Sequence, residues 1–161
     1  MDFSDLNPEA ADSEGEWVHV HGPDGSPLYA KDAGGGKWVV VTQKTEHPSR
    51  IKVLGRYSEP VQAVERKHQR KAMKSAHMVG GKKKGDPTAE FVSAYLDSQP
   101  EAAAEVAASA VVDWENIIWE GKPVSFDKKI LAQMAERQFF RDQVREASQK
   151  TADFFGAAAS S

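Results

Sequence analysis

The feature that most constrains the fold is a change of hydrophobic pattern at Ser58-Glu-Pro60. Before this tripeptide the large apolar residues come in short β-branched and aromatic runs, which are typical of strands. After it they recur every three or four residues, which is typical of helices. A serine followed by a proline in the first turn also favours a helix start. We therefore expect an α+β fold, with a small N-terminal antiparallel β-sheet followed by a mainly α-helical C-terminal part.

Four short segments of the N-terminal half have strand character: residues 17–21, 28–29, 38–42 and 51–54. The motif Pro23-Asp-Gly25 predicts a turn that brings the second segment back against the first. Three or four strands this short need a helix or a partner to cover one face. The sequence leaves open which of the two covers it, and whether the β part and the helical part pack as one unit.

In the helical half, the clearest apolar stripe runs over residues 101–119 and predicts one helix that contains Trp114 in its buried face. Asp127 is expected to cap a final helical pair. His68 and His77, on the basic helix, are expected to be solvated. The chain divides into an acidic mobile lead (1–15), a small β region (16–57), a basic helix (58–79), a flexible basic linker (80–87), a helical region (88–155) and a frayed tail (156–161).

The formal net charge of −3 hides a segregated distribution. Residues 1–49 and residues 86–161 each carry −6, whereas residues 50–85 carry +9. The cations of this basic arm can follow a phosphate backbone, but stacking aromatics and a nucleic-acid-binding motif are missing around them. We expect the arm to meet an acidic surface of the chain or of a partner, and not nucleic acid. The basic arm comprises Arg66, Lys67, Arg70, Lys71, Lys74, Lys82, Lys83 and Lys84.

The sequence offers little for catalysis. It contains no cysteine, and residues 34–36 are three glycines without the strand and helix context of a phosphate loop. His19 and His21 alternate on a strand and lack a third ligand at a metal-binding spacing. We predict no enzyme activity, no catalytic or metal-binding residue and no cofactor. The polar start and the interrupted apolar runs also predict neither a leader peptide nor a membrane association.

Six short motifs follow one another over about residues 15–155. They are Gly22-Pro-Asp-Gly25, Ile51-Lys-Val-Leu-Gly-Arg-Tyr-Ser58, Val111-Val-Asp-Trp-Glu-Asn116, Gly121-Lys-Pro-Val-Ser-Phe126, Phe140-Arg-Asp-Gln-Val144 and Phe154-Phe155. Their order resembles that of tail assembly chaperones, small proteins encoded in the tail gene clusters of tailed bacteriophages. Two departures from the family pattern are Tyr57, where the family often has Asp, and the longer sheet region at residues 31–44.

The resemblance implies a non-enzymatic factor that escorts the phage tape measure protein while the tail tube polymerises around it. Its partners would be the tape measure or other tail proteins, its location the host cell cytoplasm, and a homo-oligomer is left open. Two alternatives remain: a structural tail or head–tail component of the virion, and a basic nucleic-acid-binding accessory protein. Trp114 is expected in the core. The expected partner-binding residues are Trp119, Phe139, Phe140, Phe154 and Phe155.

Overall fold

The computed structural model describes residues 14–79 and 99–160. Its main sheet has three antiparallel strands in the order β1-β4-β5, formed by β1 (Glu16–His19), β4 (Arg50–Val53) and β5 (Val111–Glu115). Most strands lie in the N-terminal half and most helices after it, so the predicted α+β class is confirmed. The expected acidic lead and basic linker lie almost entirely outside the described residues.

Two small hairpins stand beside the main sheet. The first pairs β2 (Tyr29–Asp32) with β3 (Trp38–Val41). The predicted turn after residues 17–21 is confirmed as well, because His21 forms an antiparallel bridge with Pro27 and the backbone N–H of Leu28 donates to the carbonyl of Val20 over 2.9 Å. The second pairs β6 (Ile118–Trp119) with β7 (Lys122–Pro123) through a two-residue loop. Both loop residues have positive φ, 53° at Glu120 and 80° at Gly121, which is the backbone geometry of a tight hairpin turn.

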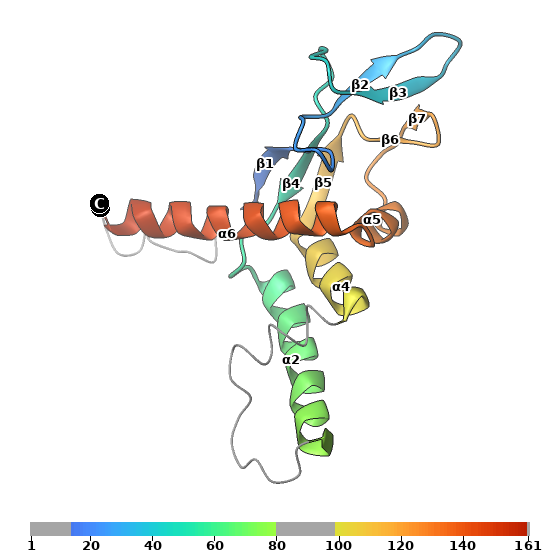
Figure 1. Cartoon of the computed structure of the whole chain (residues 1–161). Coiled ribbons are helices and arrows are strands. Elements are labelled where there is room, and N and C mark those ends of the chain that lie inside the picture. The colour runs from blue at the N-terminus through green and yellow to red at the C-terminus, as the bar shows by residue number, and fades with distance from the viewer. Residues whose placement is uncertain (1–13, 80–98, 161) are drawn as a thin grey trace.

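Four helices complete the described fold: α2 (Glu59–Val79), α4 (Pro100–Ala110), α5 (Lys128–Ala135) and α6 (Gln138–Ser160). Figure 1 shows α6 crossing beside the main sheet, with the hairpins on one side of it and α2 and α4 on the other. The predicted start of α2 and the cap of α5 are confirmed, because Asp127 accepts hydrogen bonds from the backbone N–H groups of Lys129 and Ile130. Helical backbone also continues through most of the segment expected to be a frayed tail.

The core lies where α4, α5 and α6 meet the main sheet. Strand β4 contributes Ile51 and Val53, strand β5 contributes Trp114, and α6 contributes Phe140 and Val144. Burial of each such side chain stabilises the fold by about 1.5–3 kcal/mol. The core placement of Trp114 is confirmed at 5% exposure. Its indole N–H donates to the carbonyl of Val124 over 2.9 Å, which satisfies the one polar group of this side chain.

The expected helix over residues 101–119 is wrong beyond Ala110, where the chain turns into strand β5. The expectation failed because a β-bulge gives the buried residues of β5 the spacing of a helix. Strand β5 pairs Asp113 with Lys52 but Val111 with Val53, so Val112 is an extra residue and lies exposed. The helical region expected over 88–155 therefore contains three strands, of which β5 completes the main sheet.

Two expectations about α2 are also corrected. His68 is not solvated: it is 4% exposed, and its Nε2 lies 2.9 Å from a carboxylate oxygen of Glu105 on α4. Ser58 precedes the helix as expected, but its hydroxyl does not cap it. The Oγ atom is buried and has no hydrogen-bond partner among the described residues. The proline in the first turn, Pro60, is the signal that marks this helix start correctly.

Candidate functional site

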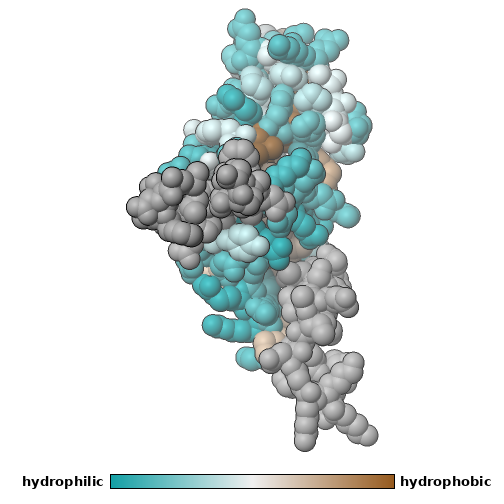
Figure 2. Space-filling view, turned by 90° about the vertical axis from the view of Figure 1, so that its left-hand side faces the viewer, coloured by the Kyte–Doolittle hydropathy of each residue, from teal (hydrophilic) through white to brown (hydrophobic). Residues whose placement is uncertain are grey.

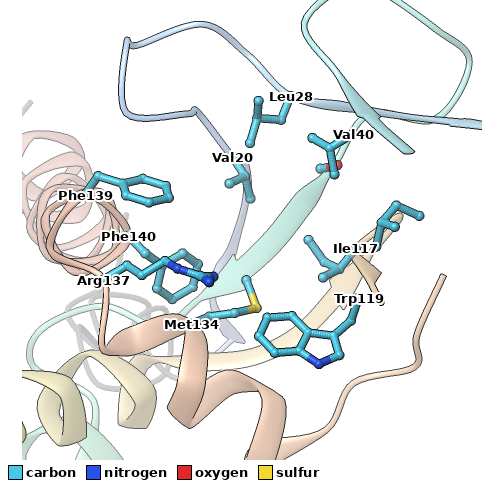
Figure 3. Close-up of a pocket in the computed structure, with 11 residues that line it drawn as sticks. Val20, Leu28, Val40, Ile117, Trp119, Met134, Arg137, Phe139 and Phe140 are labelled. Carbon is cyan, nitrogen blue, oxygen red and sulfur yellow. The ribbon is translucent and has the colours of Figure 1, made fainter. Parts of the chain in front are cut away.

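An open apolar pocket lies between the hairpins and the junction of α5 with α6 (Figure 3). Its volume is about 140 Å³. All of its described lining residues are apolar except Ser49 and Arg137. The lining is formed by Val20, Leu28, Val40, Ser49, Ile117, Ile118, Trp119, Met134, Arg137, Phe139 and Phe140. A pocket of this size accommodates one large side chain, because a cavity of about 150 Å³ holds a benzene ring.

One wall of the pocket is set by the turn that leads from β5 into the β6–β7 hairpin. Asn116 adopts a positive φ of 55°, and its amide donates to the carbonyl of Pro48 over 2.9 Å. The hydroxyl of Ser49 donates back to the carbonyl of Asn116 over 2.8 Å. These bonds fix the end of β5 against the start of β4, so Ile117 and Trp119 face the pocket (Figure 3).

The opposite wall is set by a side-chain clasp between α6 and the segment after β1. The amide of Gln143 accepts a hydrogen bond from the backbone N–H of His21 over 2.7 Å and donates to the His21 carbonyl over 2.6 Å. It pairs with the backbone much as a neighbouring strand would. Because Val20 precedes His21 and Phe139 lies one turn before Gln143, the clasp holds two lining residues on facing elements together.

Arg137 is the one charged side chain among the described residues that line the pocket. Its guanidinium carbon lies 5.8 Å from the ring centroid of Trp119, within the range of a cation–π contact. Figure 3 shows the guanidinium directed into the space between Phe140, Met134 and Val20. The pocket therefore combines an apolar floor with a single cation.

Three of the expected partner-binding residues meet at this pocket, although not in equivalent positions. Trp119 and Phe139 are partly buried lining residues. Phe140 is 2% exposed and belongs to the core, and it reaches the pocket only as part of its lining. The partner-binding role of all three residues stays a prediction. The side chains of Phe154 and Phe155 lie outside the described part of the structure.

The sequence did not single out Met134, Arg137 or the strand residues Val20, Leu28 and Val40. For the four apolar residues the only signal is apolar character on strands or on α5, which is the signal of any core residue, and Arg137 is one of several arginines in the chain. Their assembly around Trp119 depends on pairings between distant segments.

The basic arm is partly neutralised within the chain. Arg66 pairs with Glu59, and Lys67 lies 2.7 Å from a carboxylate oxygen of Glu105. The hydrogen bond from Lys67 holds the pKa of Glu105 below its ordinary value, against the opposing effect of burial and with a further contribution from His68. The other described cations of the arm are Arg70, Lys71 and Lys74, which are exposed and have no ion pair with a described residue. The expected members Lys82, Lys83 and Lys84 lie outside the described residues.

A second, wider groove runs between α6 and the β1 region. His19 and His21 lie on it, and His19 Nε2 is 2.7 Å from the carbonyl of Leu28 while His21 Nδ1 is 3.0 Å from the carbonyl of His19. Within the described ranges, no three His, Asp or Glu side chains are arranged to hold a metal ion. The groove is rimmed by Glu16, Asp142 and Glu146, and Glu146 forms an ion pair with Lys150 over 3.0 Å.

One face of the molecule is mostly polar. Figure 2 shows a largely hydrophilic face in which the hydrophobic colour gathers in one small area beside the atoms drawn in grey. The described residues of this face thus present no broad apolar strip. Among the helices of residues 14–79 and 99–160, none is both long and apolar enough to cross a membrane.

Comparison with known proteins gave no match to this chain, whether against family models, curated proteins or solved structures. The arguments for its function are therefore the geometry of the apolar pocket and the order of its sequence motifs.

Proposed function

We propose that this chain is a non-enzymatic protein-binding factor of phage tail assembly, which escorts the tape measure protein in the host cytoplasm while the tail tube polymerises. The observation that carries the proposal is the open apolar pocket where Trp119 and Phe139 converge. The motif order supports the assignment to tail assembly, and the pocket supplies the means of binding.

The dimensions of the pocket suit an escort that must later be displaced. Long helical proteins expose apolar side chains at intervals of three or four residues, and a groove binds them one anchor at a time. About 140 Å³ admits one such anchor, which contributes about 1.5–3 kcal/mol. One contact of this strength binds weakly. Several copies of this chain along one tape measure protein would together cover it more tightly.

The direct test is co-purification of the full chain with the tape measure protein that the proposal expects to be encoded in the same gene cluster. The variant Trp119→Ala removes the largest side chain of the pocket wall, and we expect retention to fall by about thirtyfold, as for an aromatic anchor contributing about 2 kcal/mol. Trp17→Ala is the matched control, because Trp17 is 41% exposed and lies outside the pocket lining. Circular dichroism of both variants checks that they fold.

Two results oppose the proposal: a wild-type chain that does not retain the tape measure protein, and equal retention by Trp119→Ala and Trp17→Ala. The structural alternative, a tail or head–tail component, is tested by mass spectrometry of purified particles. An escort is absent from them, whereas a component is present at stoichiometric copy number.

The nucleic-acid alternative has one observation in its favour: Arg70, Lys71 and Lys74 on α2 are exposed and form no ion pair with a described residue. Duplex DNA binding that falls steeply with salt, and that weakens when Lys82, Lys83 and Lys84 are neutralised, would support it. The absence of DNA binding at low salt would dismiss it. Such an experiment leaves the apolar pocket untouched, so its result is independent of the retention assay.

A further inference from the structure

The side chain that binds the end of α5 is Arg141, not the arginine at the pocket. At the same junction of α5 and α6, Arg141 donates to the carbonyl of Ala135 over 3.0 Å and to that of Glu136 over 2.6 Å. These bonds satisfy the last carbonyl groups of α5. The side chain of Arg137 makes no such bond and no ion pair with a described residue, and its guanidinium carbon lies 5.8 Å from the ring centroid of Trp119.

This environment leaves the hydrogen-bonding edge of the guanidinium available. A guanidinium over an aromatic face is held by the ring, while its N–H donors lie in its own plane and match the two oxygens of a carboxylate. Other arginines of the described chain already have carboxylate partners: Arg50 pairs with Glu115, and Arg66 pairs with Glu59. Arg137 is directed into an apolar cavity instead (Figure 3).

We propose that Arg137 makes the pocket selective for a large apolar side chain that stands next to a carboxylate, so that the segment recognised on the partner protein is acidic as well as apolar. This inference rests on the proposed function, and it names the chemistry of the anchor. On a helical partner, Asp or Glu lies three or four residues from the inserted side chain, because these positions share one helix face. The apolar lining residues bind the inserted side chain, and Arg137 favours inserted side chains that have a carboxylate beside them.

The test uses two small probes that differ only in charge, 3-phenylpropionate and 3-phenylpropanamide. Each carries a phenyl ring of a size that the pocket admits, and only the first carries a carboxylate. Titration of the ¹⁵N-labelled full chain is followed by the shift of the Trp119 indole N–H and of the Ile117 and Met134 amides. We expect both probes to move these signals and the acid to bind about three- to fivefold more tightly, as for a solvent-accessible ion pair.

Two variants decide whether Arg137 is the cause. In Arg137→Gln the preference for the acid should vanish while binding of the amide is retained. Arg70→Gln is the matched control, because Arg70 is an equally exposed arginine on α2, away from the pocket, and the preference should persist.

Each remaining outcome refutes a different statement. Equal binding of the two probes to the wild-type chain, or a preference that survives in Arg137→Gln, overturns the selective role of Arg137 and leaves the pocket as an apolar binding site. If neither probe moves the pocket signals, the pocket is not a binding site, and the proposed function loses its supporting observation as well.

Discussion

The clasp between Gln143 and the backbone of His21 gives the sharpest stability prediction. It joins residues 122 positions apart through hydrogen bonds of 2.7 and 2.6 Å. Each bond contributes about 0.5–1.5 kcal/mol net, so removal of both in Gln143→Ala should lower the free energy of unfolding by about 1–3 kcal/mol. That is a large fraction of the roughly 5–15 kcal/mol that stabilises a domain.

The free energy of unfolding is measured by urea titration, followed through the intrinsic tryptophan fluorescence. Gln133→Ala is the matched control, because Gln133 is an exposed glutamine on α5 and its replacement should change stability by less than about 0.5 kcal/mol. Gln143→Glu separates the two bonds. It keeps an acceptor for the His21 N–H but sets a carboxylate oxygen against the His21 carbonyl, so it should be destabilising as well.

Hydrogen exchange gives a local reading of the same contact. The amide of His21 should exchange faster in Gln143→Ala than in the wild-type chain, and its exchange in Gln133→Ala should stay unchanged. The reasoning is refuted if Gln143→Ala costs no more than Gln133→Ala and leaves His21 equally protected. In that case α6 would be held by its apolar contacts alone.

Three further changes have defined outcomes. Lys67 holds the pKa of Glu105 below the ordinary 4.5, so ionised Glu105 stabilises the fold. Glu105→Gln should therefore lower the Tm at neutral pH, and this difference from the wild-type chain should disappear as the pH falls below 4.5 and through the pKa of Glu105. Burial raises the pKa of Glu65 above 4.5, so the stability it contributes is lost as the pH rises; Glu65→Gln should keep or raise the Tm at pH 7. Trp114→Phe loses the 2.9 Å bond to Val124 and leaves unfilled volume, and should cost about 2–3 kcal/mol in urea unfolding.

The fold class and several element boundaries could be predicted because they depend on local signals. The predicted segments 38–42 and 51–54, where β-branched residues cluster, coincide closely with β3 (Trp38–Val41) and β4 (Arg50–Val53), and Asp127 caps a helix by accepting from N–H groups two and three residues ahead. Pro60 marked the start of α2 for the same kind of reason. Such signals need no knowledge of the rest of the chain.

The error over β5 also has a physical origin. In a regular strand, buried residues are two apart, so Trp114 would share its face with Val112. The bulge at Val112 places Val111 and Trp114 on the buried face instead, three residues apart, which is the spacing expected of a helix. A bulge is recognised from the partner strand, and here that partner is β4, far away in the sequence.

The candidate site was predictable to the extent that it consists of large aromatic residues. Trp119 and Phe139 were singled out for their size alone, and the structure places both on one pocket. Phe140 fits the same criterion but packs inward, because adjacent residues of a helix point in directions about 100° apart. The single cation of the pocket, Arg137, could not be chosen among the arginines until Trp119 was placed beside it.

The order of the main sheet has a consequence for synthesis of the protein. Strand β4 lies between β1, which precedes it in the chain, and β5, which follows only after α2 and α4. A ribosome therefore completes a large part of the chain before the sheet can close, and α6, the last described element to emerge, is also the one that covers the sheet and clasps His21. Folding that waits for such distant contacts is slow and leaves apolar surface exposed during translation. We therefore expect the nascent chain to expose apolar surface, and to be prone to aggregation, until α6 has left the ribosome.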